Sequence, residues 1–175
     1  MRYVEVKLGD LKHGDQIAVM GNVANLSPLL RPLMTLIRQT YYHHGIYDAE
    51  NMAVYHFTGA DKANAKPQKS DFTDFFAGHT QLYRVEYEDD EECLPVHEVM
   101  KRAEEAVNRS STWPGYDLIK NNCESFATYL KTGKAYSKQA FEALVFAAVR
   151  IGPVVAGSTA VSIGGSIGGS NSTLS

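Results

Sequence analysis

The chain has 175 residues, of which 44% are hydrophobic and 21% are charged. This length and composition fit one soluble globular domain and exclude collagen, a coiled coil and wholesale disorder. The 17 basic and 20 acidic residues give a net charge of −3, so we expect no nucleic-acid partner. There are two cysteines and no secretory apolar segment after Met1, so we expect thiols without disulfides and a cytoplasmic location.

Hydrophobic alternation and turn residues predict an α+β domain with an antiparallel sheet, because the predicted strands precede the predicted helices. The predicted strands cover residues 15–20, 41–48, 53–58 and 81–87. The turn at 49–51 predicts a hairpin between the second and third of these strands. The predicted helices cover residues 95–108 and 121–131. Two prolines within residues 28–38 leave a short or broken helix open there.

The C-terminal region differs in composition from the rest of the chain. Residues 151–175 carry no charge, hold six glycines and six serines, and contain the unit SIGG twice. We predict a folded domain over residues 1–140, followed by an apolar helix and a Gly/Ser-rich tail over 141–175. Residues 141–164 are long enough to span a bilayer, although they contain Arg150 and Pro153. The alternative is an amphipathic helix docked on the body and followed by the tail.

Cys123 is the candidate nucleophile, in the segment YDLIKNNCESF. Asn121 followed three residues later by Glu124 resembles a capping box, which predicts that Cys123 lies in the first turn of a helix. There the helix dipole and the unpaired N–H groups stabilise a thiolate and are available to an oxyanion. The alternative is a buried core cysteine on an amphipathic helix. Cys93 follows an acidic run and is interpreted as an ordinary thiol.

Two of the six histidines have a context that favours catalysis. On a strand, His43 and Gly45 share one face while His44 lies on the other, and Gly45 predicts open surface beside His43. His56 on the next strand is expected to reach His43 and orient its ring. The remaining histidines, His13, His79 and His97, are interpreted as structural or surface residues. Two histidines and one thiol without a carboxylate at motif spacing do not favour a metal site, and we expect no metal.

Three segments in this order, HHGIY at 43–47, YHFTG at 55–59 and NCESF at 122–126, resemble the lecithin–retinol acyltransferase-like family. Within it the chain is most similar to the small phospholipase A/acyltransferase proteins of H-Rev type. The resemblance covers roughly residues 14–160. It implies a circularly permuted papain-like domain of NlpC type, in which the histidines precede the cysteine.

The resemblance also implies a role for each matched residue. Cys123 becomes the nucleophile, His43 the general base and His56 the third member of a triad. Tyr41 matches a family tyrosine proposed to assist the oxyanion, and Asn122 supports the site. Two positions depart from the family pattern: His44 replaces a frequent tryptophan, and Ser125 replaces the histidine of the form NCEHF. Both departures concern substrate preference rather than a catalytic group.

The implied activity is a thiol-dependent phospholipase A and acyltransferase that forms an acyl thioester on Cys123 from the sn-1 or sn-2 ester of a glycerophospholipid. Water, an amine or a lyso-lipid hydroxyl then accepts the acyl group. We expect no cofactor, a monomer, and contact of the C-terminal segment with a phospholipid surface. One alternative is a cysteine isopeptidase of PPPDE type acting on ubiquitin-like conjugates, and another is an interaction protein without catalysis. The presence of His56 favours the lipid enzyme, since a Cys–His dyad needs no second histidine.

Overall fold

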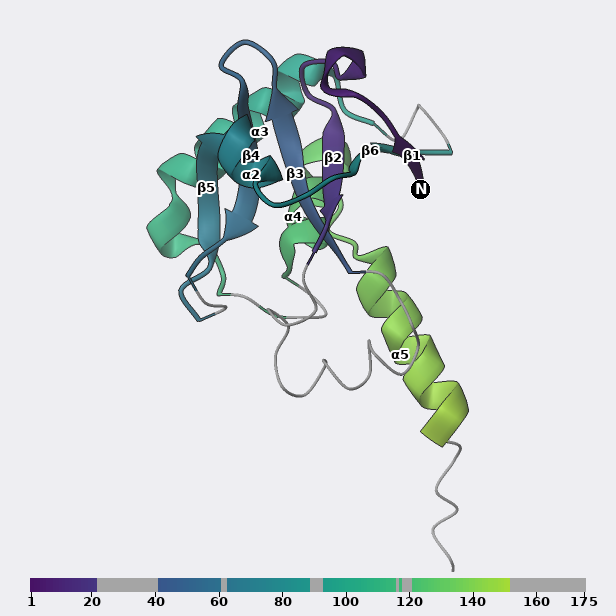
Figure 1. Ribbon diagram of the computed structural model, residues 1–175. Helices are drawn as coiled ribbons and strands as arrows, with labels where there is room; N and C mark the ends of the chain where they lie inside the picture. Colours follow the sequence, from purple (N-terminus) through teal and green to yellow (C-terminus); the bar gives the residue numbers. More distant parts are fainter. Residues whose placement is uncertain (22–40, 61–62, 89–92, 116, 118–120, 152–175) are drawn as a thin grey trace, which may run out of the picture.

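The computed structural model describes residues 1–21, 41–60, 63–88, 93–115, 117 and 121–151 (Figure 1). Six strands form one antiparallel sheet in the order β1-β6-β2-β3-β4-β5. The strands are β1 (Arg2–Glu5), β2 (Gln16–Met20), β3 (Tyr42–Asp48), β4 (Ala53–Thr58), β5 (Lys66–Asp71) and β6 (Leu82–Glu86). The helices are α2 (Phe72–Phe76), α3 (Val96–Asn108), α4 (Cys123–Thr132) and α5 (Lys138–Ile151), with short 3₁₀ turns η1 (Leu8–Asp10) and η4 (Ser110–Thr112).

Helices cover both faces of this sheet, so each face has its own hydrophobic core. On one face, Ile46, Tyr55 and Phe57 pack against α3 and α4. On the other face, Tyr47 and Val54 pack against the short helix α2, which lies in front of the sheet in Figure 1. Because successive strand residues point to opposite faces, neighbouring residues of β3 belong to different cores.

The predicted mixed fold with an antiparallel sheet is confirmed. Strands β2, β3, β4 and β6 and helices α3 and α4 lie where alternation and capping residues place them, within one or two residues at each end. Gly133 ends α4 in the left-handed conformation, with φ of 79°, as a C-terminal glycine does. The sequence analysis missed β1, β5 and α2. β5 reads KPQKSD, and it lies at one edge of the sheet, where proline and charged residues are tolerated in place of regular apolar alternation.

Helix α5 extends away from the sheet, and its first residues pack on the body (Figure 1). It runs through the predicted boundary between residues 140 and 141, and the division into two units stays a prediction. Within the described ranges, no helix has both the length and the apolar character needed to cross a bilayer. The broken helix considered for 28–38, most of the acidic run and the Gly/Ser-rich tail lie outside the described residues.

Candidate active site

Cys123 is the first residue of α4, on the sheet face that α3 and α4 cover. Asn122 caps this helix: its side-chain oxygen accepts a hydrogen bond from the Ser125 backbone N–H at 2.9 Å, and Ser125 Oγ accepts from the Asn122 N–H at 2.8 Å. The capping box is therefore Asn122 and Ser125, which corrects the predicted pair of Asn121 and Glu124 by one residue. Asn121 instead donates through Nδ2 to the backbone oxygen of Gly115 at 2.8 Å and shapes the preceding loop.

The thiol of Cys123 is buried against the backbone of β3 and the ring of Tyr41. Its Sγ lies 3.4 Å from the Tyr41 hydroxyl and 3.9 Å from the Tyr42 carbonyl oxygen. Burial raises the pKa of Cys123, and this effect outweighs the opposing hydrogen bonds from Tyr41 and from the backbone of His44. The expected thiolate at the helix start is thus wrong for the resting protein, because the helix dipole acts on a group that has lost its water.

His43 and His56 face the opposite side of the sheet and contact each other directly. His43 Nε2 lies 2.9 Å from His56 Nδ1, and His56 Nε2 lies 2.9 Å from Ser70 Oγ. The strand register explains these contacts. His56 is paired with Gly45, two residues after His43, and Ser70 is paired with Val54, two residues before His56. Each contact therefore joins diagonal neighbours on adjacent strands. The predicted contact between His56 and His43 is confirmed.

Phe75 of α2 packs on both imidazoles, with its ring centroid 5.4 Å from that of His43 and 5.5 Å from that of His56. Burial lowers the pKa of His56 to about 4. Burial, and then the nearby His56, lowers the pKa of His43 well below its ordinary value. Both rings are therefore neutral at physiological pH, and a single shared proton joins them.

Gly45 does not leave open surface beside His43, which corrects the expectation from sequence. A Cβ atom at Gly45 would lie 2.3 Å from Val54 Cγ1 and 3.3 Å from His56 Cβ. The missing side chain allows β4 to place Val54 and His56 tightly over β3, and this close approach brings the two imidazoles together.

The predicted triad is therefore divided between the two faces of the sheet: Cys123 lies on one face, and His43 and His56 lie on the other. Among the described residues, Cys123 makes no hydrogen bond to His43, and the Nδ1 atom of His43 has no hydrogen-bond partner. The Cys123 sulfur lies at the start of β3, against the Tyr42 carbonyl, three residues before the first β3–β4 pair, Gly45 and His56. A base and a nucleophile often come within hydrogen-bond distance only once substrate is bound.

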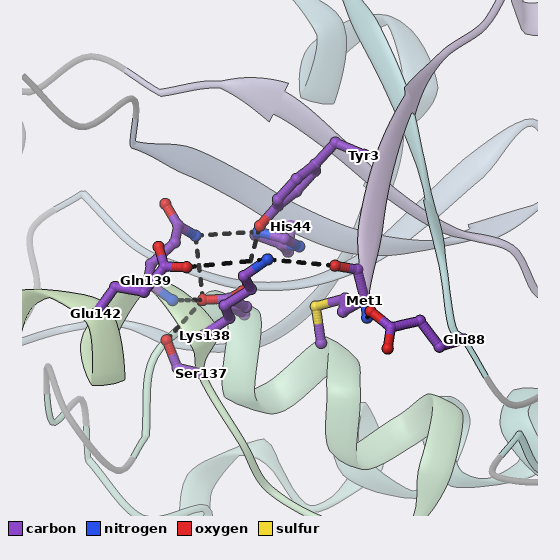
Figure 2. Close-up of polar contacts among 9 residues, drawn as sticks. Met1, Tyr3, His44, Glu88, Ser137, Lys138, Gln139 and Glu142 are labelled. Carbon is purple, nitrogen blue, oxygen red and sulfur yellow. Dashed lines mark hydrogen bonds and ion pairs between the residues drawn. The ribbon is translucent and has the colours of Figure 1, made fainter.

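His44 belongs to a second polar cluster, on the Cys123 face of the sheet. Its Nε2 lies 3.1 Å from Gln139 Nε2 and 3.2 Å from the Tyr3 hydroxyl, and its Nδ1 lies 3.3 Å from Gln16 Nε2. Figure 2 shows Tyr3 from the N-terminal strand and Gln139 from α5 both pointing at this imidazole. Burial lowers the pKa of His44, so this ring is also neutral.

Glu124, the residue after the nucleophile, joins this cluster to the start of α5. Its carboxylate, 1% exposed, accepts hydrogen bonds from Ser137 Oγ at 2.6 Å, from the Gln139 backbone N–H at 3.0 Å, and from Gln139 Nε2 and the Tyr3 hydroxyl, both at 3.2 Å. Gln139 Oε1 in turn accepts from the Tyr42 N–H at 2.8 Å. The first turn of α5 is thus fastened to β3 beside the thiol.

Of the other histidines, His79 lies near enough to His43 to lower its pKa by charge. His13 Nδ1 accepts the Ala49 N–H at 3.2 Å in the β3–β4 turn, which is a structural role. Cys93 is half-buried, and Glu86 of the acidic run is paired with Arg84 at 2.8 Å. Within the described part of the chain, no group of three or more histidine, cysteine or acidic side chains is arranged to hold a metal ion.

Sequence reasoning missed Ser70, Phe75 and Gln139. Ser70 and Phe75 sit in segments without a recognisable pattern, and Gln139 lies 95 residues after its partner His44. Only the strand register and the packing of α2 and α5 bring them to the two imidazoles.

Residues 28–136 match the lecithin retinol acyltransferase family. The chain belongs to this family. The match extends over more than half of the chain and includes both predicted catalytic histidines and Cys123. The order of the matched segments, two histidine strands before the cysteine helix, is the order seen in the fold.

The chain is also similar to the protein "Phospholipase A and acyltransferase 1" from three mammals. It is 47% identical to the Rattus norvegicus protein over 51 residues, which is 29% of each chain. It is 38% identical to the Homo sapiens protein over 64 residues, or 35% of this chain and 36% of the relative. The matched segments thus span about a third of the length of these relatives.

Proposed function

We propose that this protein is a thiol-dependent phospholipase A and acyltransferase that acts on glycerophospholipids through an acyl thioester on Cys123. The observation that carries the proposal is a cysteine at the start of a helix packed on the strand of a paired imidazole, in a chain of the lecithin retinol acyltransferase family. The names of the relatives support the same chemistry. The histidine strands precede the cysteine helix, which also supports a permuted papain-like architecture.

The protonation states determine how the first step proceeds. Burial raises the pKa of Cys123 and lowers that of His43, so the resting pair is a thiol and a neutral imidazole rather than an ion pair. We infer that the thiol proton moves to His43 Nδ1 as Cys123 Sγ attacks the ester carbonyl, which is general base catalysis. The imidazolium then protonates the leaving lyso-lipid alkoxide and leaves an acyl thioester.

The second step regenerates the thiol. Water, an amine or a lyso-lipid hydroxyl attacks the thioester while His43 takes its proton, and the Cys123 thiolate leaves and is reprotonated. We propose that the Tyr41 hydroxyl, which lies 3.4 Å from Sγ, donates to the oxyanion of either tetrahedral intermediate. Asn122 supports both steps indirectly, since its side chain is committed to the cap that fixes the position of Cys123.

A phospholipid surface is the proposed partner, and α5 is the proposed contact. Phe141, Leu144 and Val145 lie three and four residues apart on this helix and are 55%, 46% and 45% exposed. Such spacing forms one apolar stripe, which suits a helix lying in the interface of a membrane. We propose a cytoplasmic protein that associates with membranes through this stripe.

The covalent step is tested with the purified full chain and phosphatidylcholine vesicles. We expect an acyl adduct on Cys123 by mass spectrometry, together with fatty acid, lyso-lipid or, with an added amine, an N-acyl product. Cys123→Ala should abolish adduct and products, whereas the matched variant Cys93→Ala should retain both. Cleavage of a ubiquitin-type conjugate without any lipid product would instead support the isopeptidase alternative.

The lipid contact is tested by binding to the same vesicles. Phe141→Glu and Leu144→Glu should each weaken sedimentation with vesicles, because a charge replaces apolar surface in the interface. Met52→Glu is the matched control, since Met52 is 48% exposed but lies in the β3–β4 turn. An equal loss for all three variants, or no loss for any, would contradict the role of α5.

A further inference from the structure

The imidazole chain behind Cys123 ends on a serine of the edge strand. His56 is 6% exposed, and Ser70 Oγ, at 2.9 Å, is the described partner of its Nε2 atom. Ser70 itself is half-buried on β5, so its hydroxyl lies between the buried imidazoles and the surface of the sheet edge. Phe75 packs on both rings, and the Ser70 hydroxyl is the described polar group at the far end of the pair from His43.

Only two arrangements of protons satisfy the observed contacts when both rings are neutral. In the first, His43 donates from Nε2–H to His56 Nδ1, and His56 donates from Nε2–H to Ser70 Oγ. In the second, the Ser70 hydroxyl donates to His56 Nε2, and His56 donates from Nδ1–H to His43 Nε2. The proton of His43 is then on Nδ1.

The two arrangements differ in catalytic capacity. In the first, His43 Nδ1 carries a lone pair and can accept the proton of the Cys123 thiol, giving an imidazolium whose Nε2–H still donates to His56. In the second, His43 Nδ1 already carries a proton and cannot act as a base. In the first arrangement, His43 can therefore accept the thiol proton without first losing a proton of its own.

We propose that Ser70 is a positioning residue that accepts from His56 and thereby holds His43 in the tautomer with an unprotonated Nδ1. The assignment rests on the proposed function of His43 as the base for Cys123. Ser70 acts through two imidazoles and touches neither substrate nor thiol. In a catalytic triad, the third group orients the base directly. Here Ser70 orients the base one hydrogen bond further away, through His56.

Among the described residues, the titratable groups that act on His43 besides His56 are His44 and His79. A proton on either ring disfavours a proton on His43 and so lowers its pKa. Lys69 of β5 is directed away, since it pairs with Asp48 at 2.8 Å and lies over the ring of Tyr55 on the opposite face. From α2, the group in contact with both rings is the uncharged Phe75.

The test uses Ser70→Ala and Ser70→Asp in the full chain, with kcat/KM on vesicles measured from pH 4 to 9. Ser70→Ala removes the acceptor and should lower kcat/KM about 5- to 10-fold, the equivalent of one hydrogen bond. Ser70→Asp is an obligate acceptor with a negative charge, so it should retain activity and raise the apparent pKa of the acidic limb by about one unit or more. Ser110→Asp on η4 adds the same charge at a serine with no described contact to either imidazole, and it should leave the profile unchanged.

Nitrogen chemical shifts of the imidazoles give a second readout that needs no substrate. In the unmodified protein we expect protons on Nε2 of both His43 and His56, and in Ser70→Ala a mixture with the Nδ1 forms. Protons on Nδ1 in the unmodified protein, or a Ser70→Asp profile identical to that of Ser110→Asp, would overturn the assignment. Failure of the proposed function is distinguishable, since the chain would then show the expected tautomers but no lipid product.

Discussion

His43 and His44 are neighbours in the chain, yet they serve two different polar clusters on opposite faces of the sheet. His43 belongs to a short line of groups, His56 and then Ser70, that ends at a half-buried hydroxyl. His44 is fully buried in a closed cluster with Gln139 and Tyr3, which also bind Glu124. One imidazole thus has a ring nitrogen left for a proton, whereas both nitrogens of the other are occupied.

The two clusters show how one residue type serves two functions. Burial lowers the pKa of both rings, so burial by itself does not mark the base. What separates them is the number of fixed partners, because a ring held at both nitrogens is committed to structure and a ring held at one can accept a proton. The closed cluster also fastens α5 next to the nucleophile, which connects the proposed membrane contact to the site.

The largest effect is expected for His43→Ala compared with His44→Ala. His43→Ala should lower kcat by about 10²–10⁴-fold, as loss of a general base does, well beyond any effect of lost stability. His44→Ala should instead cost about 1–3 kcal/mol of unfolding free energy, because buried amide groups of Gln16 and Gln139 lose a partner. Steady-state kinetics and urea unfolding of both variants compare the loss of kcat with the loss of unfolding free energy. Equal losses of activity, or the reverse order, would contradict the comparison.

Glu124→Ala should destabilise the protein by about 3 kcal/mol, because Ser137, Gln139 and Tyr3 lose a buried acceptor. Amide hydrogen exchange should rise in the first turn of α5 before it rises in the sheet. Glu142→Ala is the matched control: this half-exposed carboxylate lies 3.8 Å from Lys138 and should contribute less than about 1 kcal/mol. Unchanged exchange in α5 after loss of Glu124 would show that the cluster does not hold this helix.

Acid should weaken the fold through the histidines that are buried as neutral rings. Unfolded His56 binds a proton near pH 6.5, but in the folded protein its pKa is about 4, so the unfolded state binds more protons between these values. The unfolding free energy is therefore complete above pH 7 and falls by about 3 kcal/mol from His56 as the pH drops to 4. Urea unfolding at pH 7 and 4.5 measures this change, and His56→Gln should reduce its slope. The same slope in that variant would assign the loss to other groups.

Gly45→Ala is expected to have the smallest effect, a loss of about 1–3 kcal/mol from overpacking against Val54. The added methyl group should also separate β4 from β3 and weaken the contact between His43 and His56. Gly9→Ala is the control, since a Cβ there meets no atom within 4 Å. Thermal unfolding of both variants is sufficient, and equal melting temperatures would mean that the close approach at Gly45 is not required.

Features that depend on local periodicity can be predicted from the residue pattern alone. A period of two over residues 42–48 separates His43 from His44, and the hairpin turn at 49–51 brings His56 back beside β3. Polar cap residues before Cys123 set the start of α4, although the cap is Asn122 rather than Asn121. Each of these follows from backbone geometry and from hydrogen bonds that span only a few residues.

The hydrogen-bond partners of these residues and the protonation state of the Cys123 thiol depend on tertiary packing. Ser70 reaches His56 because β5 pairs with β4 in one register, and Gln139 reaches His44 because α5 begins against β3. The direction of the Cys123 pKa shift was wrong from sequence, since the helix dipole is a local property while burial is produced by the whole fold. Desolvation depends on every element that excludes water from a group, and that information is distributed along the entire chain.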